Sequence, residues 1–466
     1  MSTAEIGLIG LGTMGAALAS NIADNGFDIA VFNRTTSVTH DFVANAGTLA
    51  PKITGTDTLE ALVAAIAKPR AIILMVPAGK PVDDQIAALR PLLDDDDLII
   101  DAGNALFHDT NRRAQEATGP FLGIGVSGGE EGARFGPSIM GGGQKEYWDR
   151  VAHILTAISA KHGDTACATW MGEAGAGHFV KAVHNGIEYA DMQMIAEVYG
   201  IMRDGMGMDA KAIGDVFEKW NAGPLQSYLI EISGKVAQAV DPKTGAPVLD
   251  VIVDAAGQKG TGRWTAIEAQ HLASPIPGIE AAVVARNLSS RREERAAGEE
   301  LFGAAPLRIA AGDITIEQLE SGLMAGKILS YAQGFAMIEA ASDAYEWALP
   351  LPDIARVWRA GCIIRSSMLD DMATALAENP DRNLMRAPFF ADLLKQHHMA
   401  LRQVTAVGTL HGIAMPALAS SVAYFDAMRT ALGTANMIQG QRDFFGRHSF
   451  ARRDGGDGWH GPWADA

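Results

Sequence analysis

Residues 5–15 read Glu-Ile-Gly-Leu-Ile-Gly-Leu-Gly-Thr-Met-Gly, an apolar run followed by closely spaced glycines. The run at 6–9 predicts a buried β-strand that turns directly into a helix. In that context the Gly-x-Gly-x-x-Gly pattern permits a tight turn, close approach of a pyrophosphate and packing of the helix on the strand. The free N–H groups at the helix start would face the phosphates. The pattern predicts a Rossmann-type dinucleotide site with cofactor contacts from Gly10, Leu11, Gly12, Thr13, Met14 and Gly15. A glycine-rich turn that binds nothing is the alternative.

Beyond this motif, the first third of the chain alternates short apolar runs with amphipathic segments. Strands are predicted at 6–9, 28–32, 71–76, 98–101 and 121–126, and helices at 15–25 and 82–89 among others. Such alternation is typical of an α/β domain in which helices cover a wound sheet.

The character of the sequence changes after Gly175. Long segments rich in Ala, Met and Leu predict helices up to about Gly433, and a polar, glycine-rich tail follows. We therefore predict a dinucleotide-binding domain at 1–176, an all-α domain at 177–433 and a C-terminal tail at 434–466. A tail so poor in core residues is either loose or docked elsewhere, for instance on a second subunit.

The helical region has the marks of an internal duplication. Lys181 and Tyr189 recur as Lys327 and Phe335 with the same spacing. Two similar helical units would stack around a shared core, and chance matching is the alternative. The second copy does not repeat the histidine, asparagine and glutamate of the first, so only the first copy would carry chemistry.

Length and composition set outer limits on the function. With 466 residues, 48% of them hydrophobic and 20% charged, the chain is expected to be globular with two or three domains. Its net charge of −17 disfavours nucleic acid and membrane surfaces as partners. Cys167 and Cys362, the only cysteines, provide no disulfide framework. No basic leader and no apolar run of about 20 residues occurs, so a cytoplasmic protein is expected.

The second predicted strand ends at Asn33-Arg34-Thr35. An NAD site usually has a carboxylate here, which would repel the 2′-phosphate of NADP. An amide, a guanidinium and a hydroxyl suit that phosphate instead, so NADP is the predicted cofactor. A surface arginine without a ligand is the alternative for Arg34.

Residues 177–189 place polar side chains on one face of a predicted helix. Lys181, His184, Asn185, Glu188 and Tyr189 stand at i, i+3, i+4, i+7 and i+8, and the opposite face is apolar. A lysine and a glutamate two turns apart on a semi-buried wall are suited to proton transfer. Burial and mutual charge are expected to move both pKa values toward neutrality. An ordinary solvated helix face is the alternative.

Further candidate residues lie in glycine-rich loops. Ser127, Gly128 and Gly129 follow a predicted strand and can present N–H groups and a hydroxyl to a carboxylate. A later glycine-rich segment carries Lys259 and Thr261, which suit a phosphate. A plain turn and a flexible solvated loop are the respective alternatives. No cluster of His, Cys or Asp has metal-ligand spacing, so no metal is implied.

Together these motifs closely resemble the 6-phosphogluconate dehydrogenase family. Segments at 10–15, 33–35, 126–136, 181–189, 254–264 and 441–448 correspond in order, so the resemblance spans nearly the whole chain. Val-Ser-Gly-Gly-Glu-Glu-Gly-Ala-Arg from Val126 and Lys-x-x-His-Asn-Gly-Ile-Glu-Tyr from Lys181 are highly specific to that family. Short β-hydroxyacid dehydrogenases share the glycine motif and the lysine but lack the long helical region and the tail.

The resemblance implies NADP-dependent oxidative decarboxylation of 6-phosphogluconate to ribulose 5-phosphate, in the pentose phosphate pathway and gluconate utilization. It implies that Lys181 is the general base and then an acid, with a pKa lowered by burial and neighbouring positive charge. It implies that Glu188 protonates the product enediol. It also implies a homodimer, because the family's tail reaches the partner's site, and leaves open whether dimers pair into tetramers.

The family's binding contacts carry over residue by residue. Implied substrate contacts are Asn104, Ser127, Gly128, Gly129, His184, Asn185, Tyr189, Lys259, Thr261, Arg286, Arg442 and His448. Implied coenzyme contacts outside the glycine motif are Asn33, Arg34, Thr35, Val76 and Asn104. Two segments depart from the family pattern: Pro77 stands where a lysine is typical, and 102–107 is less polar than usual. These departures bear on coenzyme affinity and on the preference for NADP.

Two other functions are compatible with parts of the sequence. An oxidoreductase for a smaller β-hydroxyacid would share the fold, but Lys259, Arg286 and Arg442 form a phosphate grip that a small acid does not need. A non-catalytic NADP-binding sensor would also share it, but Lys181 and Glu188 are both present.

Overall fold

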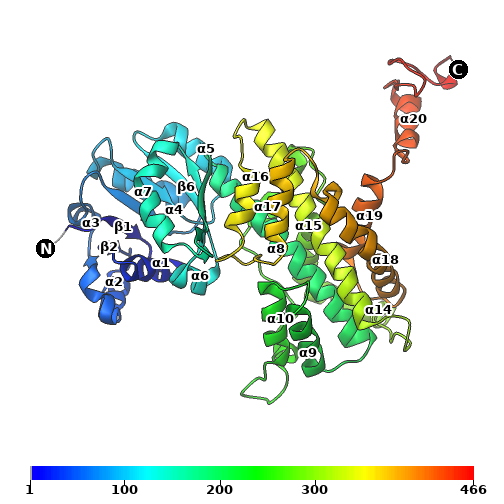
Figure 1. The fold of residues 1–466 in the computed structure, drawn as a ribbon, viewed down its shortest axis with the longest axis horizontal. Coiled ribbons are helices and arrows are strands. Elements are labelled where there is room, and N and C mark those ends of the chain that lie inside the picture. Colours follow the sequence, from blue (N-terminus) through cyan, green and yellow to red (C-terminus); the bar gives the residue numbers. More distant parts are fainter. Residues whose placement is uncertain (1–2, 466) are drawn as a thin grey trace.

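The structure is a computed structural model that describes residues 3–465. An α/β region occupies the N-terminal part of the chain, and helices make up the rest of the body (Figure 1). In Figure 1 the α/β region lies on the left in blue and cyan, and the helical region follows in green to orange.

One large sheet organises the α/β region. Its strand order is β10-β7-β6-β5-β4-β1-β2-β3. The strands are β1 (Ile6–Ile9), β2 (Ile29–Phe32), β3 (Ile53–Thr56), β4 (Ala71–Leu74), β5 (Leu98–Asp101), β6 (Phe121–Ser127), β7 (Ser138–Gly143) and β10 (Ala168–Gly172). Neighbouring strands are parallel except β6 and β7. Because β1 lies between β2 and β4, the connections after β1 and β4 diverge, which leaves a crevice at the carboxyl ends of these strands.

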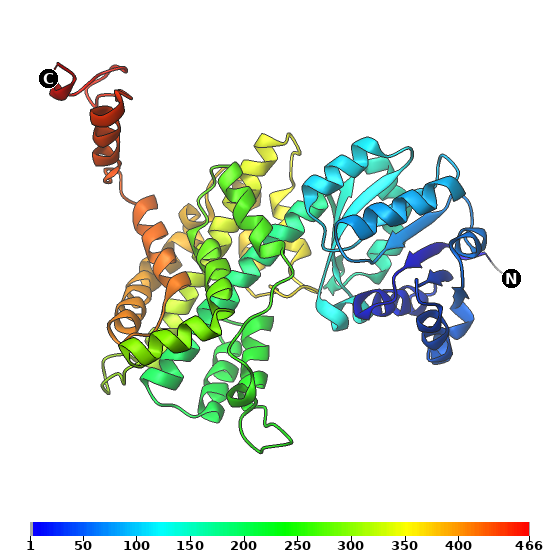
Figure 2. The ribbon, with the colours of Figure 1, turned by 180° about the vertical axis from the view of Figure 1, so that it is seen from behind.

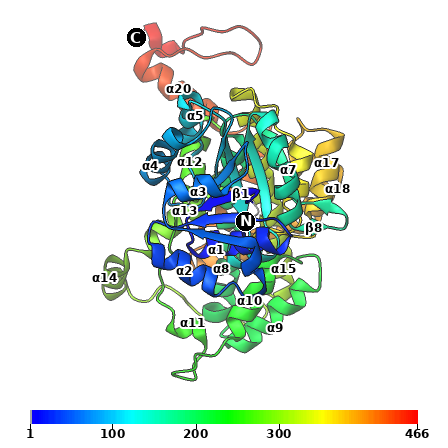
Figure 3. The ribbon, with the colours of Figure 1, turned by 90° about the vertical axis from the view of Figure 1, so that its left-hand side faces the viewer.

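Helices cover both faces of this sheet (Figure 3). Successive strand residues point to opposite faces, so Leu8 packs with α1 (Thr13–Asp24) and α7 (Lys145–Ile158), whereas Ile9 packs with α3 (Leu59–Ala65) and α4 (Lys80–Leu89). The remaining elements are α2 (Thr36–Ala44), η1 (Gly47–Lys52), η2 (Arg90–Leu92), α5 (Phe107–Glu116), α6 (Gly129–Phe135), β8 (Lys161–His162) and β9 (Thr165–Ala166).

Two long helices dominate the helical region: α8 (Ala176–Gly200) and α15 (Ile316–Ala344), which pack against each other. Thr315 and Gln318 form a capping box at the start of α15. The other elements are η3 (Ile201–Gly205), α9 (Ala210–Asn221), α10 (Tyr228–Gln238), α11 (Val248–Val251), α12 (Thr261–His271), α13 (Pro277–Ser289), α14 (Arg292–Phe302), α16 (Leu351–Val357), α17 (Leu369–Glu378), η4 (Leu384–Arg386), α18 (Pro388–Leu410) and α19 (Pro416–Met428).

The first half of α8 packs directly on the sheet, on β6 and β7. Small residues permit this approach: an added Cβ at Gly177 would lie 2.4 Å from the Met140 carbonyl oxygen, and one at Gly123 would lie 2.8 Å from the ring of His178. One helix therefore belongs to both halves of the molecule, and its polar stripe begins where they meet.

The tail extends away from the body. α20 (Ala435–Gly446) and η5 (Pro462–Asp465) lie beyond α19 and project from the helical region (Figures 1 and 2). Met437, Ile438, Phe444 and Phe445 of α20 are each at least 59% exposed. An exposed apolar surface of this kind marks an interaction surface.

The predicted order of an α/β domain followed by a large helical domain is confirmed. Strands at 6–9 and 98–101 are confirmed as predicted, and those at 28–32, 71–76 and 121–126 are observed as Ile29–Phe32, Ala71–Leu74 and Phe121–Ser127. The helices predicted at 15–25 and 82–89 are observed as Thr13–Asp24 and Lys80–Leu89. β3 and β7 were not predicted because threonines and glycines make their hydrophobic pattern weak.

The predicted domain limits fall at element boundaries. The last strand of the sheet ends at Gly172, and the division at 176/177 lies at the start of α8. The division at 433/434 lies between α19 and α20. Among residues 3–465, no helix is both long and apolar enough to span a membrane.

Candidate active site

The polar stripe predicted at 181–189 lies on α8 and is largely buried. Lys181 is 6% exposed, His184 0% and Tyr189 5%. Asn185 and Glu188 are partly buried. The prediction of a semi-buried wall is confirmed, and the alternative of a solvated face is wrong.

Lys181 lies against the sheet with its amine buried. Gly125 of β6 makes room for it, since an added Cβ there would come within 2.4 Å of the Lys181 Cβ. The nearest polar partner of its Nζ is His184 Nδ1 at 3.4 Å, and among residues 3–465 no carboxylate forms an ion pair with it. Burial lowers the pKa of Lys181, and the charge of Glu188 opposes this shift only in part. The predicted lowering is confirmed, but burial is its cause, and neighbouring positive charge plays no part.

His184 connects the lysine to two neighbouring side chains. Its Nε2 lies 3.2 Å from Ser127 Oγ, and its Nδ1 lies 3.0 Å from Asn185 Oδ1. Burial, together with the charge of Lys181, holds the pKa of His184 well below its usual value, so the ring is neutral. The amide oxygen of Asn185 favours a proton on Nδ1, which leaves Nε2 to accept from the serine hydroxyl. In that tautomer the lone pair of a neutral Lys181 amine faces an N–H donor.

Glu188 lies one turn further along α8, with Oε2 3.9 Å from His184 Nδ1. Burial raises its pKa, whereas the charges of Lys181 and Arg286 lower it in part. The expectation that mutual charge moves both pKa values toward neutrality is therefore wrong, because opposite charges stabilise each other's ionised forms. Burial is the largest cause of both shifts, and the charge of Asp191 adds to the shift of Glu188, so the pKa of the amine is lowered and that of the carboxyl group is raised.

The loop after β6 provides one side of the site. Ser127 is 1% exposed, with its hydroxyl on His184. Gly128 has a φ of +127°, and an added Cβ there would lie 2.4 Å from the Gly361 carbonyl oxygen, so a larger residue does not fit. Gly129, with a φ of +64°, opens α6. The three predicted carboxylate contacts thus lie together beside His184.

A second group of predicted residues gathers at the start of α12. Thr261, its first residue, accepts a hydrogen bond from Asn185 Nδ2 at 2.8 Å. The Arg286 guanidinium stacks 3.4 Å from the centre of the Tyr189 ring and donates to the Gly257 carbonyl at 3.1 Å. Thr261 and Arg286, predicted on the sugar-phosphate side together with Tyr189, therefore contact the stripe at Asn185 and Tyr189.

Four predicted substrate residues are not drawn into this network. Asn104, in the loop after β5, and Lys259, in the loop before α12, are exposed. Arg442 and His448 lie on the projecting tail, where Arg442 donates to Gln439 Oε1 at 2.9 Å (Figure 1). These two tail residues lie apart from the site of their own chain.

The glycine loop after β1 has the geometry of a dinucleotide site. Gly10 has a φ of +100°, and an added Cβ there would lie 2.4 Å from the Met75 carbonyl oxygen. An added Cβ at Gly15 would lie 1.8 Å from the Gly10 carbonyl oxygen. Gly12, the N-cap of α1, has no atom within 4 Å of such a Cβ. The open space therefore lies in front of the α1 N-terminus, where a pyrophosphate fits.

The residues after β2 and β4 flank this loop. Leu11 donates its backbone N–H to Asn33 Oδ1 at 3.0 Å, so both residues shape the loop. Arg34 and Thr35 are exposed, and Arg34 has no hydrogen bond or ion pair with any other described residue. Val76 is partly buried and close to Gly10. The Arg34 guanidinium is therefore available to an anionic ligand group that binds beside β2.

Comparison with protein families identifies the chain. The NAD binding domain of 6-phosphogluconate dehydrogenase matches residues 5–172, and the 6-phosphogluconate dehydrogenase C-terminal domain matches residues 177–463. The chain belongs to the 6-phosphogluconate dehydrogenase family.

Similar family members include enzymes named for either coenzyme. The NAD(+)-dependent, decarboxylating 6-phosphogluconate dehydrogenase of Bacillus subtilis is 44% identical over 99% of both chains. The NADP(+)-dependent enzyme of the same organism is 44% identical over 99% of this chain and 100% of its own. Overall identity therefore does not separate the two coenzymes.

A solved structure shares the whole fold. The 6-phosphogluconate dehydrogenase of Plasmodium falciparum, solved in its apo form, with NADP+ and with 6-phosphogluconate, superposes with a TM-score of 0.94. It is 39% identical and covers 98% of this chain and 100% of its own. The shared fold thus extends through the helical region.

The structure adds neighbours that sequence reasoning did not single out for the site. The Trp358 ring lies 5.7 Å from the His184 ring, and Gly361 packs on the loop of Gly128. Their Trp-Arg-Ala-Gly sequence echoes Trp-Asn-Ala-Gly from Trp220, a repeat that could have drawn attention to them. Burial raises the pKa of the adjacent Cys362 thiol to about 12, so it adds no charge beside the lysine.

Proposed function

We propose that the chain catalyses oxidative decarboxylation of 6-phospho-D-gluconate to D-ribulose 5-phosphate and carbon dioxide, with reduction of NADP. Family membership supports the reaction. One observation supports the roles within it: Lys181 and Glu188 stand two turns apart on the buried face of α8, and burial shifts both pKa values toward neutrality.

NADP, held by the loop 10–15 and by Arg34, supplies the hydride acceptor when bound. Lys181 acts first as a general base. Its lowered pKa increases the neutral fraction of the amine, which takes the proton of the C3 hydroxyl as that carbon is oxidised. Ser127 and Asn185 hold the neutral His184 ring in place beside the amine.

The resulting β-keto acid loses carbon dioxide because the electrons of the breaking C–C bond flow into the adjacent carbonyl. Lys181, now protonated, donates to that carbonyl oxygen as negative charge develops. The product of this step is an enediol. Glu188, whose raised pKa keeps a proton available nearer neutral pH, protonates its first carbon while Lys181 takes back the proton of the enediol hydroxyl, which leaves the ketone of ribulose 5-phosphate.

The substrate would span the network from the β6 loop to α12. Ser127, Gly128, Gly129 and His184 would bind its carboxylate side, and Asn104 and Asn185 its hydroxyls. Its phosphate would be bound by Tyr189, Lys259, Thr261, Arg286 and Arg442, with His448 nearby. Supporting this division, the hydrogen bond from Asn185 to Thr261 joins the two ends of the network at 2.8 Å.

The direct test mixes purified protein with 6-phosphogluconate and each coenzyme. Reduced coenzyme and carbon dioxide are expected in a one-to-one ratio. Coenzyme reduction without gas would point to a dehydrogenase for a smaller acid, and neither signal would point to a non-catalytic sensor.

The choice of NADP rests on the unpaired guanidinium of Arg34. Arg34→Ala is expected to raise the KM for NADP at least about tenfold, the size of a lost charge-assisted contact, and to leave that for NAD nearly unchanged. Arg70→Ala is a matched control, since that arginine is already paired with Asp97 at 2.7 Å. Equal effects of Arg34→Ala on both coenzymes would contradict the assignment.

We further propose a cytoplasmic homodimer that serves the pentose phosphate pathway and gluconate utilization. The exposed apolar face of α20 and the distance of Arg442 from its own site support a tail at 434–466 that serves the partner. Mixed dimers test this: Lys181→Met and Arg442→Ala chains are each defective alone. Refolded together, they should regain activity, because one site then receives an intact lysine and an intact arginine from different chains. Absence of any regain would assign Arg442 to its own chain.

A further inference from the structure

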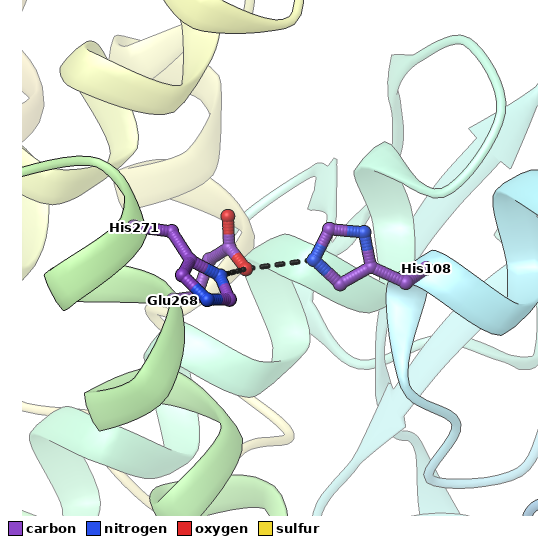
Figure 4. Close-up of side chains that lie close together, drawn as sticks. All are labelled: His108, Glu268 and His271. Atoms are coloured by element: carbon purple, nitrogen blue, oxygen red, sulfur yellow. Dashed lines mark hydrogen bonds and ion pairs between the residues drawn. The ribbon is translucent and has the colours of Figure 1, made fainter.

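Three metal-ligating side chains meet where α5 of the sheet region faces α12 of the helical region (Figure 4). His108 Nε2 lies 2.8 Å from Glu268 Oε2, and His271 Nδ1 lies 3.3 Å from the same oxygen. One potential ligand atom from each residue lies within 4.8 Å of the others. His108 and Glu268 are 160 residues apart in the chain, so their spacing in the sequence gave no sign of the cluster.

Glu268 is the buried member of the cluster, with its side chain 4% exposed. Its other oxygen accepts a hydrogen bond from the Tyr345 hydroxyl. The carboxyl group is thus oriented from behind by a hydroxyl, the support that metal-binding carboxylates typically have.

This buried charge lacks a permanent counter-ion. Among residues 3–465, Glu268 forms ion pairs with His108 and His271 and with no lysine or arginine. A buried carboxylate without a lysine or arginine partner favours a cation at this point.

The two histidines leave the cluster open to solvent. The side chains of His108 and His271 are 45% and 63% exposed, so an ion has an entry path and water has access to a remaining position. Two histidine nitrogens and one carboxylate oxygen form a ligand set that Zn²⁺ accepts, with water as the fourth ligand. Both histidines approach the same oxygen of Glu268, so small side-chain rotations suffice to place all three ligand atoms around one ion.

We propose that His108, Glu268 and His271 form a binding site for a divalent transition-metal ion of the zinc type. The ion would connect the two halves of the molecule. α5 follows the loop that carries Asn104, and α12 begins at Thr261, so the ion would fix the positions of elements on both sides of the substrate network without touching it.

The alternative is a latch made of hydrogen bonds only. In that arrangement the histidines donate to the carboxylate and no ion is needed. The two arrangements differ in one measurable property. Only with a metal site would added Zn²⁺ stabilise the folded protein, and this stabilisation would depend on all three residues.

Calorimetric titration of the tag-free, full-length protein with Zn²⁺ tests the proposal. We expect one strong site per chain. His108→Gln and His271→Asn, which change exposed side chains, should each weaken this site at least about tenfold, and Tyr345→Phe should weaken it less, with unchanged stoichiometry. Co²⁺ in place of Zn²⁺ should give visible absorption bands typical of four-coordinate geometry, which the two histidine variants lose.

His40→Gln is the matched control. His40 is also an exposed histidine on a carboxylate, 2.7 Å from Asp57, but it lacks a third ligand. It should leave Zn²⁺ affinity unchanged. Absence of a strong site in the unsubstituted protein, or equal losses in the His40, His108 and His271 variants, would overturn the proposal and leave the hydrogen-bonded latch.

Discussion

The two long helices of the helical domain each bury one lysine. α8 carries Lys181, 6% exposed, and α15 carries Lys327, 0% exposed, at matching positions of the predicted duplication. Their surroundings differ. Lys327 Nζ reaches both oxygens of Asp191, at 2.7 and 2.5 Å, whereas Lys181 Nζ reaches only the neutral ring of His184, at 3.4 Å.

The partner, and not the depth of burial, separates the two roles. A buried ammonium that meets a carboxylate stays charged and connects two helices, because the ion pair compensates much of the desolvation cost. A buried amine without such a partner loses part of its affinity for protons and can act as a base. In the proposed function, α15 therefore supports the fold while α8 carries the chemistry.

The largest expected effect comes from removing the unpaired lysine. Lys181→Met should lower kcat by roughly 10³- to 10⁴-fold, because both the general base and the later acid are lost. Lys327→Met should leave kcat per folded molecule within about threefold, since that lysine contacts no substrate residue. Steady-state assays of NADPH formation, with NADP binding as a check on the fold, measure both. Similar losses of kcat in the two variants would remove the distinction.

The second-largest effect is on the free energy of unfolding, and here the loss of Lys327 matters more than the loss of Lys181. Lys327→Met should lower the free energy of unfolding by about 3–5 kcal/mol, because it leaves Asp191 charged and buried without a partner. The double variant Lys327→Met/Asp191→Leu should recover most of that loss, since neither charge remains. Urea denaturation followed by circular dichroism measures these values. A double variant as unstable as the single one would show that the ion pair is not the source of the stability.

Glu188 and Asp191, two carboxylates of α8, are expected to differ in their effect on turnover. Glu188→Gln should lower steady-state turnover roughly 100-fold, because the amide cannot protonate the enediol. The first oxidation needs only Lys181, so a burst of about one NADPH per site should precede the slow phase. Asp191→Asn is the matched control: it should lower stability, as Lys327→Met does, and leave the time course of the folded molecules without a burst. A Glu188→Gln enzyme with normal turnover would exclude this residue from the mechanism.

Much of the sheet could be predicted because its signals are local. β1, β5 and the turn at Gly10 combine an apolar run with glycines whose positions depend on backbone geometry alone. β7 could not be predicted, because its Ser-Ile-Met-Gly-Gly-Gly sequence owes its strand form to pairing with β6 and to the approach of α8. Glycines that serve packing between distant elements leave no periodic pattern in their own segment.

The site could be predicted along one helix but not across elements. The spacing of Lys181 and Glu188 identified the stripe, and burial then determined the direction of both pKa shifts. The contact of Asn185 with Thr261 and that of Gly128 with Gly361 join segments far apart in the chain, so no local pattern reports them. The same holds for His108 beside Glu268.

The smallest expected effect is a change in the free energy of unfolding that has opposite signs for the two lysine variants. A lysine whose pKa is lowered in the folded state costs stability, because the unfolded chain binds its proton more tightly. That cost is fully present below the folded pKa, declines as the pH rises, and vanishes above the unfolded pKa of about 10.4. Lys181→Met should therefore raise the free energy of unfolding, by about 1 kcal/mol at pH 7, with a gain that shrinks toward pH 10. Lys327→Met shifts the same quantity in the opposite direction. Urea denaturation at several pH values measures the difference, and a destabilised Lys181→Met protein at pH 7 would mean that its amine is paired and charged after all.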